Sequence, residues 1–414
     1  MRYAAIVIGG GPAGMAAACA ADGTKKVLII EREARLGGIL KQCVHDGFGV
    51  IRFGEKLSGP EYADRFIDEV YSRKNIDVKT LTFVTEIEKR DGYFRVTTTS
   101  GKGIESYEGE NLILACGCRE RTARQVNIHG TRPAGLMTAG TAQNLVNLQG
   151  VNPAGKCVIL GSGDIGLIMA RRLTLEGSKV IGVYEAKSAP SGLSRNLQQC
   201  LYDFGIPLHL KKTVTLVHGR DRVEGVTVAD ADDGMRPIEG TEEYIPCDAL
   251  IVSVGLIPEN ELAEKLGIIT DPKTKGPIVD QYMMTTLDGV YSVGNALHVH
   301  DLVDYVSEVA ETAGKDAGRR KERATIEVGS RGLGYIVPQK VDVLNQEEYT
   351  VYYFRAARET GKAKLTVTVN GAEIYSKKYA SLRPPEAERV RIKHLLKAGD
   401  EHMFVLEEED DRKA

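Results

Sequence analysis

The sequence predicts an α/β protein with two Rossmann-like, three-layer domains and a C-terminal all-β module. Three observations support this prediction. A pattern of strand, glycine turn, helix and strand begins near residue 4, and the same pattern begins again at Cys157. Beyond about residue 325 the chain changes to short alternating segments with turn residues between them, which is typical of an all-β unit.

The composition excludes several classes of protein. With 414 residues the chain is long enough for roughly two to four domains. The 54 Lys and Arg nearly balance the 57 Asp and Glu, so no basic field for nucleic acid is predicted. No apolar run approaches the ~18 residues of a membrane span. Seven scattered cysteines favour reduced thiols, and therefore a cytoplasmic protein.

The first nucleotide-binding pattern begins with an apolar run, 4–8, that reads as a buried parallel strand. The turn Gly9-x-Gly11-x-x-Gly14 follows at once, and small residues at helical spacing come next. A second apolar run, 27–30, ends in Glu31. Glycines let a pyrophosphate approach the backbone, the helix N-terminus offers free N–H groups, and the acid can accept hydrogen bonds from a ribose. We predict a dinucleotide site here.

The second pattern repeats this order. The strand 157–160 leads to Gly161-x-Gly163-x-x-Gly166, a helix follows, and the strand 180–184 ends in Glu185. A carboxylate at this position repels a 2′-phosphate, so Glu185 favours NADH over NADPH, although Lys187 could soften that preference. Two such units in one chain indicate two dinucleotides.

With both units in view, the chain resembles the two-dinucleotide-binding flavoproteins, the family of thioredoxin and glutathione reductases. The segments "ENLILACGCRERTA" and "CDALIVSVGLIPENEL" look like those that close the first and second nucleotide domains of the family. The resemblance implies FAD on the first domain and NAD(P)H on the second. The predicted cofactor-binding residues are Gly9, Gly11, Pro12, Ala13, Gly14, Glu31, Arg32, Gly37, Gly38, Ala115, Gly117, Gly161, Gly163, Asp164, Ile165, Gly166, Glu185, Gly255, Gly294, Asn295 and Asp304.

The segment "GNALHVHDLVDYV", 294–306, could be mistaken for a metal site because two histidines and two aspartates lie close together. It looks like the late flavin motif of the family, in which a Gly-Asp turn places its Asp on the ribityl chain. Asn295 stands at that Asp, and it would bond a ribityl hydroxyl without charge assistance. We expect no metal here. His298, His300 and Asp301 would form a polar cluster at the flavin edge, with Asp301 or Asp304 capping the next helix.

The disulfide members of the family carry a cysteine pair beside the flavin. This chain has Cys43 alone on the loop after Gly37-Gly38, and the spacing of Cys116 and Cys118 is too short for an ordinary disulfide. We therefore expect no dithiol relay. The resemblance brings that loop near the flavin, so the candidate catalytic residues are Lys41, Cys43 and His45. Taken alone, each of them reads first as an ordinary loop residue.

A narrower resemblance covers about residues 1–325. The stretch 37–66 and the late motif look like the small FAD subunits of heteromeric NADH oxidases, of proline and opine dehydrogenases, and of complexes with glycerol-3-phosphate-dehydrogenase-like proteins. The resemblance implies an FAD-dependent NAD(P)H oxidoreductase of the NADH oxidase or dehydrogenase subunit type. Its electrons would pass to or from a larger flavoprotein subunit, or to O2, within a homo- or hetero-oligomer. The alternative is a non-catalytic assembly subunit that supports a catalytic dehydrogenase.

The expected boundaries follow the family, in which the second domain is inserted into the first. We predict an FAD-binding domain at 1–122 and 283–325 and an NAD(P)H-binding domain at 123–282. The module at 326–414 reads as a small β-sandwich with a hairpin turn at Asn370-Gly371. It carries no cysteine and no evident catalytic cluster, so we expect a role in docking or assembly.

Overall fold

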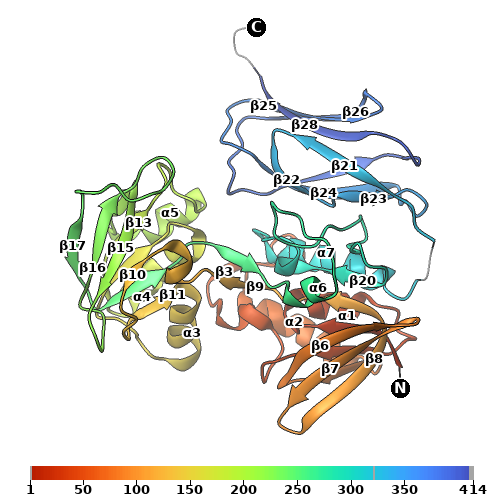
Figure 1. Cartoon of the computed structure of the whole chain (residues 1–414), viewed down its shortest axis with the longest axis horizontal. Helices are drawn as coiled ribbons and strands as arrows, with labels where there is room; N and C mark the ends of the chain where they lie inside the picture. Colours follow the sequence, from red (N-terminus) through yellow and green to blue (C-terminus); the bar gives the residue numbers. More distant parts are fainter. Residues whose placement is uncertain (1, 320–321, 410–414) are drawn as a thin grey trace. The chain divides into compact units, whose positions relative to one another are not determined.

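A computed structural model describes residues 2–319 and 322–409, and it confirms the predicted α/β class with its C-terminal all-β module (Figure 1). Two compact units are present. Unit 1 joins Met1–Cys118 to Pro258–Ala414, and unit 2 is the intervening Arg119–Ile257. The two connecting segments pair as a short sheet of β9 (Cys118–Glu120) and β19 (Leu256–Pro258). Within the described ranges, no helix is both long and apolar enough to span a lipid bilayer.

Unit 1 is built on a seven-stranded sheet in which one long strand, β8, has two roles. The carboxyl half of β8 lies parallel to β1 and β20, and the amino half pairs antiparallel with β7. The predicted meander is therefore the continuation of the nucleotide-binding sheet. The strands are β1 (Arg2–Ile8), β2 (Val27–Ile30), β5 (Ile76–Lys79), β6 (Thr82–Arg90), β7 (Tyr93–Ser100), β8 (Gly103–Leu114) and β20 (Val290–Ser292).

The helices of unit 1 pack on the parallel part of this sheet. α1 has buried Ala and Met residues on most of its surface, so it lies between the sheet and its helical neighbours. A capping box of Ser58 and Glu61 fixes the start of α2. The remaining elements are α1 (Pro12–Ala20), η1 (Gly38–Gln42), β3 (Asp46–Phe48), β4 (Leu57–Ser58), α2 (Gly59–Ser72), α6 (Glu261–Lys265), η4 (Gly294–Ala296) and α7 (Val303–Asp316).

Unit 2 repeats the arrangement on a smaller scale. A five-stranded parallel sheet has the order β11-β18-β12-β13-β14, and a separate four-stranded sheet has the order β10-β15-β16-β17. The elements are η2 (Ala123–Val126), β10 (His129–Gly130), β11 (Leu136–Thr138), α3 (Ala139–Gln149), β12 (Lys156–Leu160), α4 (Asp164–Leu175), β13 (Lys179–Glu185), α5 (Ser194–Cys200), η3 (Tyr202–Phe204), β14 (Leu208–Leu210), β15 (Lys212–His218), β16 (Gly225–Asp230), β17 (Glu243–Pro246) and β18 (Ala249–Val252).

The C-terminal module is a sandwich of two sheets, with orders β23-β21-β28-β25-β26 and β22-β24-β27. Asn370 and Gly371 both have positive φ and turn β25 into β26, as a tight hairpin requires. The strands are β21 (Thr325–Arg331), β22 (Leu333–Val337), β23 (Lys340–Asp342), β24 (Tyr349–Ala356), β25 (Ala363–Val369), β26 (Ala372–Tyr379), β27 (Glu388–Lys393) and β28 (His402–Glu408). Residues 410–414 of the predicted module lie outside the described residues.

The segment 258–282 belongs to unit 1 here, although we expected it in the inserted domain. Ala263 and Ile268 are buried against the outer face of the unit 1 sheet, and Val279 lies in the core that also contains α1. The burial of these apolar side chains holds the segment in unit 1. No pattern in the sequence distinguishes the two sheets that this segment could cover.

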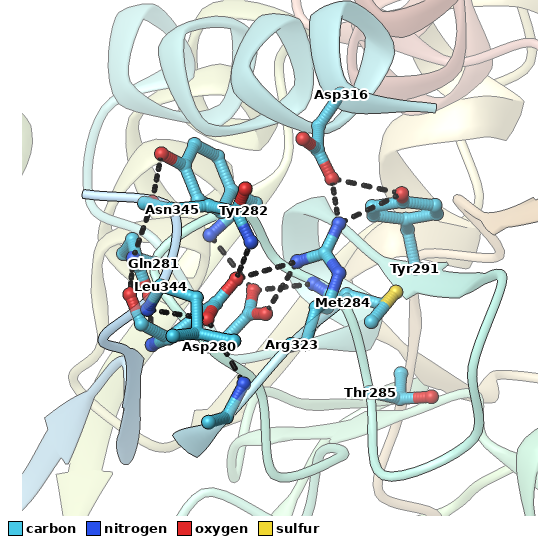
Figure 2. A network of polar contacts seen from close by, with 12 residues as sticks. Asp280, Gln281, Tyr282, Met284, Thr285, Tyr291, Asp316, Arg323, Leu344 and Asn345 are labelled. Atoms are coloured by element: carbon cyan, nitrogen blue, oxygen red, sulfur yellow. Dashed lines mark hydrogen bonds and ion pairs between the residues drawn. The ribbon is translucent and has the colours of Figure 1, made fainter. Parts of the chain in front are cut away.

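A buried ion network ties three parts of unit 1 together (Figure 2). The Arg323 guanidinium is paired with Asp280 before β20 and with Asp316 at the end of α7. It also lies 3.9 Å from the carboxylate of Asp342 in β23. All three carboxylates are at most 3% exposed. The network joins the flavin-type domain to the first strands of the β module.

Candidate functional site

The first glycine turn, between β1 and α1, is closed toward the sheet and open on its other side. Gly9 has a φ of +107°, and a Cβ there would lie 2.3 Å from the Ala115 carbonyl oxygen. A Cβ on Gly14 would lie 1.8 Å from the Gly9 carbonyl oxygen, so the helix can start this close to the strand only without a side chain. The nearest atom to a Cβ on Gly11 would be the Gly38 Cα, at 3.8 Å.

The N-terminus of α1 begins at this open position. Its N-cap is Gly11, and no side chain caps the helix. Pro12 has no N–H group, and the N–H groups of Ala13 and Gly14 have no partner within the helix. A diphosphate accepts such hydrogen bonds and is favoured by the positive end of the helix dipole. The turn therefore fits the diphosphate of a dinucleotide.

Glu31 holds the glycine turn from the end of β2. It is 6% exposed, and its two carboxylate oxygens accept hydrogen bonds from the Gly10 N–H at 2.7 Å and the Glu33 N–H at 2.8 Å. An ionised carboxylate has about four acceptor sites, so capacity remains for ribose hydroxyls. Arg32 beside it is exposed. Glu31 both anchors the turn and keeps acceptor capacity at the predicted ribose position.

A second pair of glycines packs on the first turn. The Gly37 N–H donates to the Gly10 carbonyl oxygen at 2.9 Å. Gly38 has a φ of +54°, and a Cβ there would lie 2.9 Å from the Gly11 Cα. The chain enters the loop of the candidate catalytic residues through this contact, so that loop starts beside the diphosphate cradle.

The three candidate catalytic residues lie on this loop, and each has a contact of its own. Lys41 forms an ion pair with Glu33 and donates to the Arg35 carbonyl oxygen at 2.9 Å. Burial raises the pKa of the Cys43 thiol to about 12, which keeps it protonated at neutral pH, whereas a reactive thiol has a lowered pKa. The His45 Nδ1 lies 3.1 Å from its neighbour's carbonyl oxygen. A catalytic role for these residues stays a prediction.

The late turn packs directly on the start of α1. A Cβ on Gly294 would lie 2.8 Å from the Ala13 Cβ, and the Gly294 φ is +65°. The Asn295 side chain accepts from the His300 N–H at 3.1 Å, so it braces its own loop. Asn260, 5% exposed, donates to the Ala296 carbonyl oxygen at 2.9 Å. These bonds brace the predicted flavin turn, and the close approach of Gly294 to Ala13 places the turn on the start of α1.

The prediction that Asp301 or Asp304 caps α7 is wrong. The N-cap is Leu302, and no side-chain hydrogen bond caps the helix. Asp301 instead pairs with Arg355 and accepts from the Ala387 N–H at 2.6 Å. Asp304, 5% exposed, accepts from the Arg52 N–H at 2.9 Å. Asp304 lies in the first turn of α7, but its carboxylate bonds the Arg52 segment, so neither acid caps the helix.

The second glycine turn, between β12 and α4 in unit 2, repeats this geometry. Gly161 has a φ of +101°, and a Cβ there would lie 2.0 Å from the Ser253 carbonyl oxygen. A Cβ on Gly166 would lie 2.5 Å from the Gly161 carbonyl oxygen, whereas one on Gly163 would meet nothing within 4 Å. Gly163 is the N-cap of α4, again without a side-chain cap. This turn also fits a diphosphate.

Glu185 is the counterpart of Glu31 and has more partners. It is 6% exposed, and one oxygen accepts from the Ser162 N–H at 3.1 Å and the Ser162 hydroxyl at 2.5 Å. The Ser191 hydroxyl reaches the same oxygen at 3.2 Å, and the Lys187 N–H reaches the other at 3.2 Å. The carboxylate is therefore fixed in the turn, with less acceptor capacity left than Glu31 has.

Asp164 and Ile165 form the first turn of α4. The Asp164 carboxylate accepts from the Leu193 N–H at 2.9 Å and the Asn196 side chain at 2.6 Å. It therefore attaches the segment before α5 to the glycine turn, and Ile165 is half-buried beside it. Gly117 in unit 1 and Gly255 in unit 2 have positive φ, and a Cβ at either would meet nothing within 4 Å.

Several site residues were missed by sequence reasoning. Ser162 lies between the glycines of the second turn, and a hydroxyl at that position was a signal for a partner of Glu185. Asn260 lies within the quoted segment that closes the second domain, but its contact with the late turn is about 36 residues away in the chain. Arg355 lies in the β module, and no local pattern connects it to the late turn.

The cysteines and the histidine-rich segment have the following structure. All seven cysteines lie among the described residues, and none of them forms a disulfide. Within residues 2–319 and 322–409, no group of three or more His, Cys, Asp or Glu is arranged to hold a metal ion. His298 is buried, and its ring stacks on that of His300 with the centroids 3.9 Å apart.

Comparisons with known proteins agree with this geometry. The family model described as pyridine nucleotide-disulphide oxidoreductase matches residues 3–317. Hydrogen cyanide synthase subunit HcnB of Pseudomonas protegens is 30% identical over 64% of this chain and 58% of its own length. An opine oxidase subunit from Agrobacterium tumefaciens is 25% identical over 76% of this chain and 64% of its own length. The match thus spans about three-fifths of these curated relatives.

The fold comparison gives the same result. The crystal structure of Lactococcus lactis thioredoxin reductase covers 76% of this chain and 97% of its own, with a TM-score of 0.64 and 20% sequence identity. The predicted resemblance is confirmed. The predicted cofactors, FAD and NAD(P)H, are those that proteins of this kind use, and both glycine turns have the open, uncapped form that such dinucleotides need.

Proposed function

The chain belongs to the pyridine nucleotide-disulphide oxidoreductase family, and on that premise we propose that it is an FAD-dependent NAD(P)H oxidoreductase working without a dithiol. Hydride passes between the nicotinamide and the flavin, and the electrons are exchanged with a partner flavoprotein subunit. Two curated relatives are named as subunits of larger enzymes, which supports a partner. O2 is the other acceptor compatible with this site.

One observation carries the proposal. In each unit, a Cβ added to the glycines on the sheet side of the turn would lie under 3 Å from a backbone atom, whereas the N-cap glycine of the uncapped helix has open space beside it. In each unit a buried glutamate at the end of the next strand hydrogen-bonds that turn. Two complete dinucleotide cradles support a relay between two dinucleotides.

The protein residues of this proposal mainly bind and orient. Gly11 and Gly163 leave space at the N-termini of α1 and α4, and Glu31 and Glu185 fix the turns from behind. The chemistry that bound FAD supplies is reversible acceptance of a hydride. The N-terminus of α7, next to the late turn, has no side-chain cap and carries Asp304 in its first turn. The rate of hydride transfer would then depend on how the protein positions the nicotinamide ring against the flavin ring.

The protonation of the cysteine thiols supports a route for electrons out of the flavin that does not use cysteine. Burial raises the pKa of Cys43 and of Cys116 to about 12, so neither is poised as a thiolate. Neither Cys43 nor any of the other six cysteines forms a disulfide. Reduced flavin would therefore pass its electrons outward to the partner, and in the opposite direction oxidised flavin would accept them from the partner.

The test is anaerobic reduction of the purified full-length chain. We expect a yellow flavoprotein whose visible absorption is bleached by NADH and recovers with an added artificial electron acceptor. The variant Cys43→Ser should be reduced at the same rate. A chain that binds neither nucleotide would point to a purely assembling role. If the Cys43→Ser variant is reduced but cannot pass electrons on, the thiol-free exit is contradicted.

A further inference from the structure

The β module is bonded to the predicted flavin segment of unit 1. Val337 and Tyr353 of the module are buried in the same hydrophobic core as Leu297 and Val306. The Tyr353 hydroxyl donates to Glu308 of α7 at 2.8 Å. Arg389 of β27 also pairs with Glu308, with its Nε 3.0 Å from the carboxylate. The module thus holds the first turns of α7.

Arg355 in β24 reaches the loop that precedes α7. Its side chain is 16% exposed and forms an ion pair with Asp301. The same guanidinium donates to the Val299 carbonyl oxygen at 3.3 Å and to the Tyr335 hydroxyl at 2.9 Å. It also donates to the carbonyl oxygens of Pro384 and Pro385. The planar guanidinium of Arg355 bonds the loop and the β module at the same time. It therefore fixes the loop relative to the module.

The loop held in this way contains two imidazoles with unsatisfied nitrogens. His298 is 1% exposed, and its Nδ1 lies 3.5 Å from the Tyr335 hydroxyl. Its Nε2 and both nitrogens of His300 are buried, and none of the three has a hydrogen-bond partner among the residues that the structure describes. In native proteins about nine-tenths of buried polar groups have a partner. Three such nitrogens in one stacked pair indicate a partner that the chain does not supply.

Both imidazoles are neutral. Burial lowers the pKa of His300 to about 3, and burial with the neighbouring His300 lowers the pKa of His298 well below its usual value. Arg355 adds to both shifts. A neutral imidazole has one N–H donor and one acceptor nitrogen. The pair therefore suits a ligand edge that carries both donors and acceptors, as the pyrimidine side of an isoalloxazine does.

We propose that the β module is a positioning element of the flavin site, in which Arg355 holds the segment 298–301 so that the imidazoles of His298 and His300 hydrogen-bond the bound flavin. This inference rests on the proposed function. The segment belongs to the predicted flavin turn, because the His300 N–H donates to Asn295 and Gly294 packs on Ala13. His298 and His300 are the residues in contact with the cofactor, and Arg355 and Tyr335 act through them.

The experiment uses the full-length chain with FAD. The FAD dissociation constant, the visible spectrum of the bound flavin and its midpoint potential are measured for His300→Phe, Arg355→Met and Arg355→Lys. We expect His300→Phe and Arg355→Met to weaken FAD binding about tenfold and to shift the spectrum and the potential. Lysine can pair with Asp301 but cannot form the fork, so Arg355→Lys should be intermediate. Arg358→Met, which removes an exposed ion pair with Glu408, should behave as wild type.

Thermal unfolding of the FAD-free chain separates a cofactor contact from a structural role. His300→Phe removes two unpartnered nitrogens, so the FAD-free variant should unfold no earlier than wild type although it binds FAD less well. If Arg355→Met does not fold, His300→Phe and Arg355→Lys decide the question. Unchanged FAD affinity, spectrum and potential in both would overturn the inference, as would equal losses in Arg358→Met. A wild-type chain that binds no FAD would overturn the proposed function itself.

Discussion

Glu31 and Glu185 occupy equivalent positions in the two glycine turns, but their hydrogen-bond partners differ. Glu31 and Glu185 were both predicted from their place at the end of a strand, and both are buried there. The structure adds that each carboxylate is bonded to its own glycine turn, to the Gly10 N–H in one unit and to Ser162 in the other. These acids therefore hold the cradle, and their contact with a ribose stays a prediction. Their local partners could not be read from spacing alone.

Glu185 should set the choice of nicotinamide cofactor. Glu185→Gln keeps an oxygen for Ser162 and removes the negative charge that repels a 2′-phosphate. We expect the ratio of kcat/KM for NADH to that for NADPH to fall about tenfold, a change of ~1.4 kcal/mol. Stopped-flow reduction of the flavin with both donors measures the ratio. An unaltered ratio would show that Glu185 only braces the turn.

Substitutions at two glycines of the second turn should affect NADH binding and folding stability separately. A Cβ on Gly163 meets no chain atom within 4 Å, so Gly163→Ala should fold normally but bind NADH at least tenfold more weakly because a methyl group intrudes on the cradle. A Cβ on Gly166 would lie 2.5 Å from a carbonyl oxygen, so Gly166→Ala should lower the free energy of unfolding by about 1–3 kcal/mol. Calorimetric NADH titration and urea unfolding of both variants check this. Equal behaviour of the two would contradict the open cradle.

At the scale of the elements, the helices that meet behind the flavin-type sheet depend on close backbone approach. α1 and α7 come from opposite ends of unit 1, and Gly314 of α7 allows the contact, because a Cβ there would lie 2.1 Å from the Ala17 carbonyl oxygen. α1 and its glycine turn could be predicted from the first 31 residues. The partner helix could be placed only through the resemblance, since no local pattern shows which helix faces Ala17.

Gly314→Ala should push α1 and α7 apart. We expect a loss of about 1–3 kcal/mol in the free energy of unfolding, and weaker FAD binding because both helices begin beside the cradle. Gly23→Ala is the matched control, since a Cβ there would meet nothing within 4 Å and its φ is unstrained. Urea unfolding followed by circular dichroism measures both. A stable Gly314→Ala would mean that the two helices tolerate a wider separation.

The sequence was informative where a function depends on local order and uninformative where it depends on long-range contact. Strand, turn, helix and acid follow one another within about 30 residues, so both cradles and the meander were predictable. The role of the module was not, because its contacts with the segment after the late turn come from Tyr335 and Arg355, more than 30 residues from His298. The capping prediction for Asp301 failed for the same reason, since Arg355 engages that carboxylate.

At the scale of the whole molecule, unit 1 is joined internally by a charged centre. Arg323 pairs with Asp280 and Asp316 and lies near Asp342, so three carboxylates share one guanidinium in a buried place (Figure 2). Burial raises the pKa of Asp280 to about 6 even though Arg323 opposes the shift. Asp280 therefore takes up a proton at a higher pH than an ordinary aspartic acid does.

The raised pKa of Asp280 gives a pH dependence of known sign. The folded chain binds this proton more tightly than the unfolded chain, so the stabilisation is complete below the unfolded pKa of 3.8 and is lost as the pH rises through about 6. Compared with Asp280→Asn, the wild type should gain about 1–3 kcal/mol of unfolding free energy between about pH 7.5 and about pH 4.5. Urea unfolding of both chains over this range measures the difference. If the difference in unfolding free energy between the two chains does not change with pH, Asp280 is not the group that takes up the proton.

Removal of the shared guanidinium should be far more costly than removal of an exposed one. Arg323→Met leaves the carboxylates of Asp280 and Asp316 buried without a counter-charge, and breaking such a group costs about 3–5 kcal/mol. Because the network connects α7 to the module, the variant should also weaken FAD binding. Arg331→Met is the control, since its ion pair with Glu407 is exposed on both sides and should contribute less than ~1 kcal/mol. Urea unfolding and FAD titration of the two variants make the comparison, and similar losses in both would show that the buried network does not hold the module in place.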